Sequence, residues 1–170
     1  MNSKIAILGL VEIISSISIG VIILSVTYTL LKRYGKRKFD VSHDNLSYSI
    51  FVASVLFGVG YMVSGVIQPI ISSFRVLSTT ELDYHFMLVF LGYGFIYILI
   101  AYVFGLIVSL SGIFLYSNLT PIDEFQQIKN NNIGVALIVS AIIITLILMS
   151  RGGVMLIIES IIPYPTLPPK

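Results

Sequence analysis

The sequence has no cysteine, no tryptophan and few charged residues, and each scarcity excludes something. Without cysteine the chain forms no disulfide, no thiolate metal site and no cysteine nucleophile. Without tryptophan, tyrosine and phenylalanine must supply any aromatic belt at a membrane surface. Charged residues make up 11 % of the 170 residues and the net charge is +2, which is too small to favour nucleic acid as a partner.

Apolar residues dominate what is present. They make up 56 % of the chain, and the mean hydropathy of +0.99 lies far above that of an average soluble domain. Four apolar runs, at about 5–31, 46–74, 86–115 and 133–162, each exceed the ~20 residues that a bilayer requires. We therefore expect an all-α polytopic membrane protein, a bundle of four transmembrane helices in a single domain, residues 1–170.

The positive charges predict the orientation. Five of the seven residues after the first run are basic, whereas the loop at 75–85 has one arginine. By the positive-inside rule the loop at 32–44 is cytoplasmic and both termini lie outside, in the cytoplasmic (inner) membrane. The same residues could contact anionic lipid headgroups, although a topology signal alone explains them equally well. They are Lys32, Arg33, Lys36, Arg37 and Lys38.

An internal repeat relates the two halves of the chain. An offset of 87 positions places Asn45 on Asn132, Met62 on Met149 and Gly65 on Gly152. We interpret residues 5–74 and 86–162 as two tandem helix hairpins with the same topology. Parallel repeats of this kind occur in transporters, so the repeat does not separate a transporter from a passive bundle.

The third loop, residues 116–132, has structure of its own. Thr120 is a good N-cap ahead of Pro121 at a first helical position, and acidic residues follow in the first turn, where the helix dipole favours them. A short helix is therefore expected from Thr120, followed by a polar collar at Asn130 to Asn132. The loop is either a solvated turn or a docking site for a cytoplasmic protein. Its candidate contact residues are Thr120, Pro121, Glu124, Phe125, Lys129, Asn131 and Asn132.

This loop also resembles a known family. Its Thr-Pro, Glu-aromatic, Ile-Lys and Asn pattern, followed by an apolar helix rich in small residues, resembles the YjfL-like family of small bacterial inner-membrane proteins. The resemblance implies a duplicated two-helix unit and no established activity. The second hairpin, 86–162, matches well and the first only weakly, because Gly35 to Asp40 stand where the motif would be.

Charged residues inside the runs form a candidate intramembrane polar site, Glu12, Arg151 and Glu159. Each costs roughly 2.5–3.5 kcal/mol at the centre of a span unless it is partnered. Arg151 and Glu159 lie about 12 Å apart along one helix and on different faces, so they cannot pair. One hypothesis is an ion pair between Arg151 and Glu12. The alternative is that the span ends near Ser150, with a break at Gly152-Gly153 and Arg151 extending to headgroups.

Two function classes remain open, and an enzyme is not expected. No nucleophile lies near a base, and His43 and His85 fall on opposite sides of the membrane, so neither a catalytic site, a metal site nor a cofactor is predicted. The preferred class is an oligomeric scaffold or accessory subunit that contacts lipid, other copies or a cytoplasmic protein. The alternative is a small transporter or channel. A transporter requires a hydrated polar cavity, and a scaffold only a dry bundle.

Overall fold

The computed structural model describes residues 3–39, 45–77, 84–119 and 124–161. These form the helices α1 (Ser3–Phe39), α2 (Leu46–Leu77), α3 (Tyr84–Leu119), α4 (Glu124–Lys129) and α5 (Ile133–Ile161). Within the described ranges, α1, α2, α3 and α5 are long and apolar enough to cross a membrane. The prediction of an all-α membrane protein with four spanning helices is confirmed.

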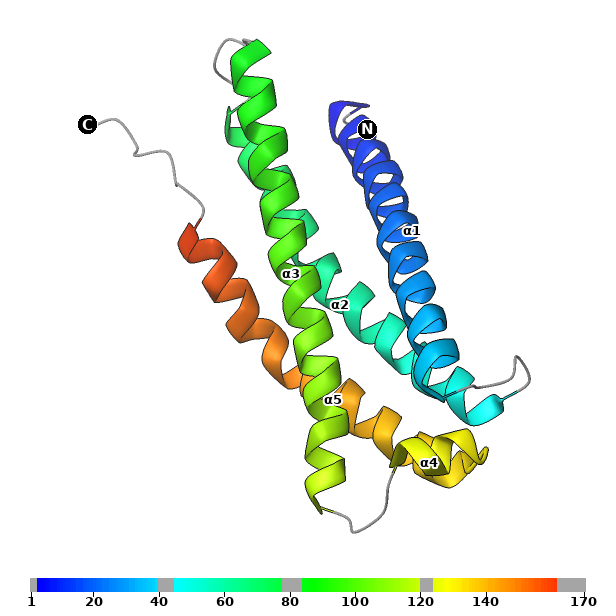
Figure 1. Cartoon of the computed structure of the whole chain (residues 1–170). Coiled ribbons are helices and arrows are strands. Elements are labelled where there is room, and N and C mark those ends of the chain that lie inside the picture. The colour runs from blue at the N-terminus through cyan, green and yellow to red at the C-terminus, as the bar shows by residue number, and fades with distance from the viewer. Residues whose placement is uncertain (1–2, 40–44, 78–83, 120–123, 162–170) are drawn as a thin grey trace.

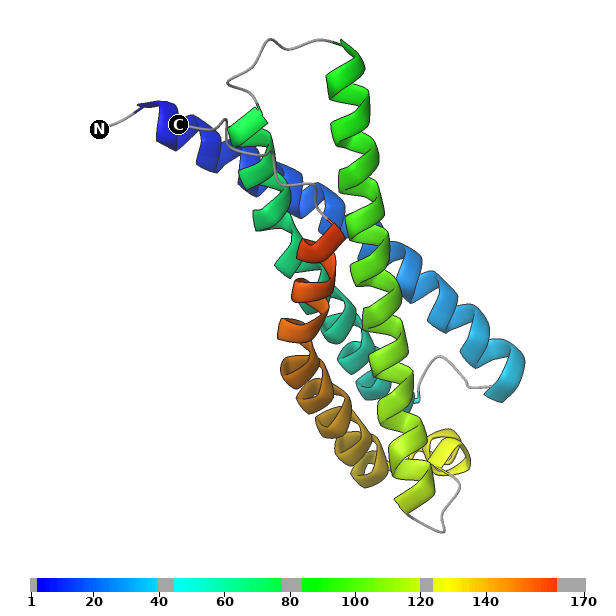
Figure 2. The same ribbon diagram turned by 90° about the vertical axis from the view of Figure 1, so that its left-hand side faces the viewer.

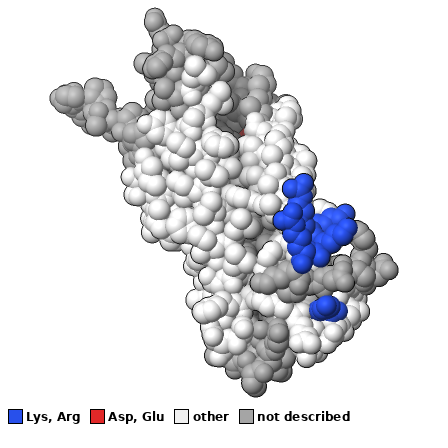
Figure 3. All heavy atoms as spheres, in the orientation of Figure 1, with Lys and Arg blue, Asp and Glu red and all other residues white. Residues whose placement is uncertain are grey.

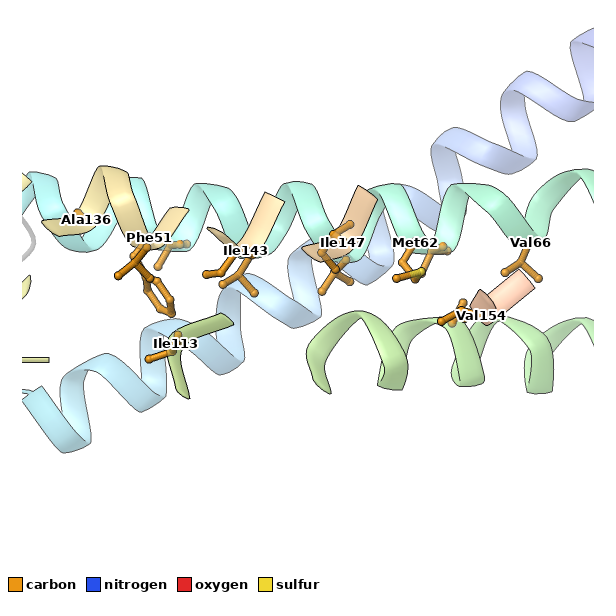
Figure 4. Packing of buried hydrophobic residues seen from close by; sticks show 14 of the residues in the cluster. Phe51, Met62, Val66, Ile113, Ala136, Ile143, Ile147 and Val154 are labelled. Atoms are coloured by element: carbon orange, nitrogen blue, oxygen red, sulfur yellow. The ribbon is translucent and has the colours of Figure 1, made fainter. Parts of the chain in front are cut away.

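The core lies between α2, α3 and α5, which pack on one another along most of their length (Figure 1). Val59 and Met62 of α2 and Ile143 and Ile147 of α5 are fully buried there (Figure 4). Since lipid is as apolar as these side chains, close packing rather than exclusion from water must hold the helices together. Glycine and other small residues are what make such packing close.

Three glycines mark the places where the core helices approach most closely. A Cβ on Gly58 of α2 would lie 3.0 Å from a side-chain carbon of Ile147, and one on Gly105 of α3 would lie 3.2 Å from the Cα of Val59. A Cβ on Gly112 of α3 would lie 2.9 Å from Cγ1 and 3.3 Å from Cα of Ile143. Backbone atoms cannot rotate away as side chains can, so Gly105 and Gly112 set the distance from α3 to its neighbours.

Helix α1 is peripheral. It packs mainly on α2 and crosses the other helices obliquely (Figure 2). The Thr27 hydroxyl lies 3.5 Å from that of Tyr102 on α3, and Leu24 touches Gly60. Beyond this contact, towards the start of α1, an open groove of about 240 Å³ separates α1 from α2, with small residues on both walls. Its lining includes Ser16, Gly20, Gly60 and Ser64.

The two sequence halves share their helix caps but not their buried faces. The side chains of Asn45 and Asn132, which the 87-residue offset aligns, accept hydrogen bonds from backbone N–H groups three residues later, at the starts of α2 and α5. Met62 and Met149 are also aligned, yet Met62 is 0 % exposed and Met149 78 %. Helix α2 contacts three spanning helices, whereas α5 packs mainly on two, which explains the difference. The tandem-hairpin organisation stays a prediction.

Candidate functional site

The first candidate is a basic cluster at one end of the bundle, formed by the exposed side chains of Lys32, Arg33, Lys36, Arg37 and Lys129. Figure 3 shows cations gathered in two neighbouring groups towards one end of the molecule, whereas the described surface drawn in white around them is uncharged. The start of α1 and the end of α5 lie towards the opposite end (Figure 1). Four of the five cations come from α1 and one from α4.

The sequence placed the first four cations in a loop that follows a helix ending near Leu31, and this was wrong. Helix α1 continues to Phe39. Lysine and arginine are good helix formers, and cations near a helix C-terminus are favoured by its dipole, so nothing in 32–38 stops the helix. The cations are therefore spread around two helical turns rather than along a flexible loop.

A contact with α2 fixes this end of α1. The Tyr48 hydroxyl donates a hydrogen bond of 2.5 Å to the carbonyl oxygen of Leu31. A Cβ on Gly35 would fall within 2.9 Å of three atoms of the Tyr48 ring and hydroxyl, so the ring lies directly on the glycine backbone. Glycine at position 35 is thus required by close packing, and it costs α1 roughly 1 kcal/mol of helix propensity.

Asn45 joins the start of α2 to the end of α4. Its Nδ2 donates to the carbonyl oxygens of Ile128 (2.9 Å) and Lys129 (3.0 Å), and its Oδ1 accepts from the backbone N–H of Tyr48 (2.8 Å). One buried amide therefore bonds two carbonyls at the end of α4, where helical partners run out, and one N–H at the start of α2. Ile128 is buried beside it.

Asn131 and Asn132 complete the turn between α4 and α5. Asn131 has a positive φ of 59°, and its Oδ1 accepts from the N–H of Ser47 at 3.0 Å. Asn132 donates from Nδ2 to Oε1 of Gln127 at 2.9 Å and caps α5. Asparagine tolerates the left-handed conformation better than most residues, which explains its use here. In the predicted polar collar, Asn131 and Asn132 therefore accept hydrogen bonds from backbone N–H groups at the starts of α2 and α5.

The remaining predicted residues of the third loop are placed only in part. Helix α4 begins at Glu124, and Thr120 and Pro121 lie outside the described residues, so the predicted N-cap at Thr120 stays a prediction. Lys38 and Glu124 lie in helices, but their side chains are also outside what is described. Phe125 packs against the core. Sequence reasoning missed Tyr48 and Ser47, and only Asn45, an asparagine before an apolar run, carried a signal.

The second candidate is the intramembrane polar site. The guanidinium carbon of Arg151 lies 4.2 Å from the centroid of the Tyr61 ring on α2. The described contact of Arg151 is thus with a ring of α2, and the ion pair with Glu12 stays a prediction. Glu12 is on α1, which packs mainly on α2, whereas Arg151 faces α2 from α5. Helix α5 also continues through Gly152 and Gly153, so the predicted break is absent.

Glu159 lies two turns beyond Arg151 on α5 and is half-buried. These two charges are thus not brought together. Glu12 is about 30 Å along α1 from Lys32, and Arg151 about 28 Å along α5 from Asn132, at 1.5 Å per residue. Both lengths approach the ~30 Å hydrocarbon thickness, which puts both charges towards the end opposite the basic cluster.

The described core is apolar, with only a few buried hydroxyl groups. Its buried hydroxyls mostly donate to carbonyls of their own helices, as Ser54 does to Phe51 and Ser109 to Gly105. Ser140 of α5 reaches across to Ile50 of α2 at 3.4 Å, and the Ser47 hydroxyl, near the basic end, has no partner. The described residues contain no group of three His, Asp or Glu side chains that could hold a metal ion.

Comparison with known proteins adds a family match but no activity. No curated protein and no solved structure matches the chain. A family described as Domain of Unknown Function (DUF350) matches residues 90–161, which cover most of α3 and all of α4 and α5. The second half of the chain is thus similar to a family of unknown function, as its resemblance implied, and the chain is an uncharacterised membrane protein.

Proposed function

We propose that this protein is a non-enzymatic scaffold or accessory subunit of a membrane complex, oligomeric, and anchored at its basic end to anionic lipid headgroups. The observation that carries the proposal is the apolar core between α2, α3 and α5. A path for a solute or ion needs polar groups or water across the hydrocarbon, because unsatisfied polar groups cost several kcal/mol there.

The basic cluster supports the lipid contact. Each exposed cation near an anionic surface contributes about 1 kcal/mol, so its five residues together supply up to about 5 kcal/mol. By the positive-inside rule the same cluster supports a topology with the basic end in the cytoplasm and both termini outside. The resemblance of the third loop supports the inner membrane of a bacterium as its location. The match of the second half would then be to the YjfL-like branch of the family.

Exposed glycines support association between copies. A Cβ on Gly92, Gly152 or Gly153 would meet no atom within 4 Å, so these glycines serve no packing inside the chain. Small residues on lipid-facing helix surfaces allow helices of different molecules to approach closely. Light scattering of the purified protein in detergent should therefore give a mass above that of one 18.8 kDa chain.

A small transporter or channel is the second candidate. The presence of Arg151 in a spanning helix favours it, since charges in spans commonly line ion or proton paths. The contact of Arg151 with the Tyr61 ring, which offers no site for an ion to bind, weighs against such a path. Position 109 separates the two functions, because Ser109 on α3 is fully buried and lies at least nine residues from either end of the span Leu91–Asn118.

The test is a cysteine-accessibility scan, for which the cysteine-free chain needs no prior change. Single cysteines replace Glu12, Ser16, Ser109, Arg151 and Glu159, and a membrane-impermeant thiol reagent is applied to intact membranes. Positions 12 and 159 should label and position 109 should not. Lys129→Cys, exposed at the basic end, and fully buried Ile143→Cys are the positive and negative controls after permeabilisation. If position 109 is labelled and a solute blocks the labelling, the protein is a transporter and the scaffold proposal is wrong.

A further inference from the structure

The Arg151 side chain lies in a cradle built by α2 and α5. Tyr61 lies under its guanidinium at 4.2 Å. On the adjoining turn of α2, a Cβ on residue 65 would come 3.0 Å from Arg151 Nε and 2.8 Å from Met155 Sδ, so both side chains lie against the glycine backbone. The aromatic ring and the bare backbone at Gly65 hold the guanidinium in one place, unlike a freely moving surface arginine.

The ring face holds the cation without accepting its N–H donors. A guanidinium has five N–H donors in a planar fork, and the face of a ring offers them no lone pair. Among the described side chains no carboxylate pairs with Arg151, and Glu159 on the same helix is about 12 Å further along the axis. The fork fits a phosphate, which can accept two parallel charge-assisted hydrogen bonds.

The depth of the cradle selects a lipid as the source of that phosphate. Tyr61 lies about 24 Å along α2 from the Asn45 cap and Arg151 about 28 Å along α5 from the Asn132 cap. These lengths end near the hydrocarbon boundary opposite the basic cluster, where phospholipid phosphates lie.

The surface next to the cradle fits the rest of a phospholipid. Phe57 stacks on Tyr61 with ring centroids 5.9 Å apart and lies one turn nearer the middle of the span. It is 49 % exposed, so an acyl chain can lie against it. Towards the middle of the span, the cation of Arg151 is therefore followed by the Tyr61 ring and then by the Phe57 ring. A phospholipid whose phosphate lies at Arg151 would place its glycerol region near Tyr61 and an acyl chain against Phe57.

We propose that Arg151, held over Tyr61 at Gly65, binds the phosphate of a phospholipid in the leaflet opposite the basic cluster, with an acyl chain against Phe57. This site is independent of the scaffold function, because it would exist equally in a transporter. It is also distinct from the contact of the basic cluster with lipid, which lies at the other end of the bundle.

The test is lipid binding by native mass spectrometry. The full chain, purified in detergent, is titrated with phosphatidylglycerol, and bound lipids are counted for the wild type, Arg151→Gln, Arg151→Lys and the control Lys129→Gln. Arg151→Gln should lose one lipid or bind it about tenfold more weakly, the effect of removing a charge-assisted hydrogen bond. Arg151→Lys keeps the charge but lacks the fork, so its affinity should fall less. Lys129→Gln should retain this lipid.

Two further arms identify the source of the phosphate. Diacylglycerol, which has the chains but no phosphate, should not fill the site, and inorganic phosphate should not displace phosphatidylglycerol. Equal binding by the wild type and both Arg151 variants would overturn the proposal, as would displacement by inorganic phosphate or loss of the same lipid in Lys129→Gln. If Arg151→Gln does not fold, Arg151→Lys decides: unchanged affinity in that variant overturns the role of the fork.

Discussion

Replacing Gly112 by alanine tests whether backbone contact between α3 and α5 sets the packing of the core. The new Cβ would lie 2.9 Å from Cγ1, 3.3 Å from Cα and 3.5 Å from N of Ile143, a residue with no exposed surface. Overpacking of this kind costs about 1–3 kcal/mol. Alanine also gains up to about 1 kcal/mol over glycine in helix propensity, so the net loss is smaller than the packing cost.

Gly92→Ala is the matched control, because Gly92 lies in the same helix and a Cβ there would meet no atom within 4 Å. Both variants gain the same propensity, so Gly112→Ala should be less stable than Gly92→Ala by about 1–3 kcal/mol. The assay is unfolding by SDS in mixed micelles, followed by far-UV circular dichroism. Equal midpoints for the two variants would refute the view that α3 and α5 pack through backbone contact at Gly112.

Three other predictions concern the basic end. Asn45→Ala should destabilise the protein by about 2–3 kcal/mol in the same assay, because three hydrogen bonds of about 1 kcal/mol each are lost. The control Asn132→Ala, at an exposed cap, should cost at most about 1 kcal/mol. Equal losses in the two variants would contradict the bridging role of Asn45. Gly35→Ala should free α1 from α2 and increase proteolysis near the end of α1, and Tyr48→Phe, which deletes only the hydroxyl, should do so less. Replacing the four α1 residues of the basic cluster by glutamine should weaken pull-down by anionic relative to neutral vesicles by up to about 4 kcal/mol, and an unchanged ratio would rule out the lipid contact.

Much of the fold could be predicted because lipid imposes simple rules on sequence. A spanning helix must be long and apolar, so the four runs predicted four helices, and the resemblance in 116–132 led to the half of the chain that a family of unknown function matches. Helix ends were predicted less well. Polar Lys32 to Lys38 looked like a loop, yet helical propensity and the contact of Gly35 with Tyr48 extend α1 to Phe39.

The partners of individual side chains could not be predicted. Arg151 was paired with Glu12 by depth alone, but depth says nothing about which helix faces meet. In the structure Arg151 lies on the Tyr61 ring of α2. Asn131 was expected to contact a partner protein, yet it accepts a hydrogen bond from Ser47, 84 positions earlier in the chain.

The sequence by itself determined the class of this protein, its number of spanning helices and the end at which positive charge gathers, because these depend on composition along one dimension. The tertiary structure alone decided that α1 is peripheral, that α2, α3 and α5 enclose an apolar core and that an arginine rests on a tyrosine. The physical reason is that these helices are apolar around most of their surface. When every face can meet lipid, hydrophobic patterning does not select neighbours, and the shapes of small residues such as Gly105 and Gly112 do.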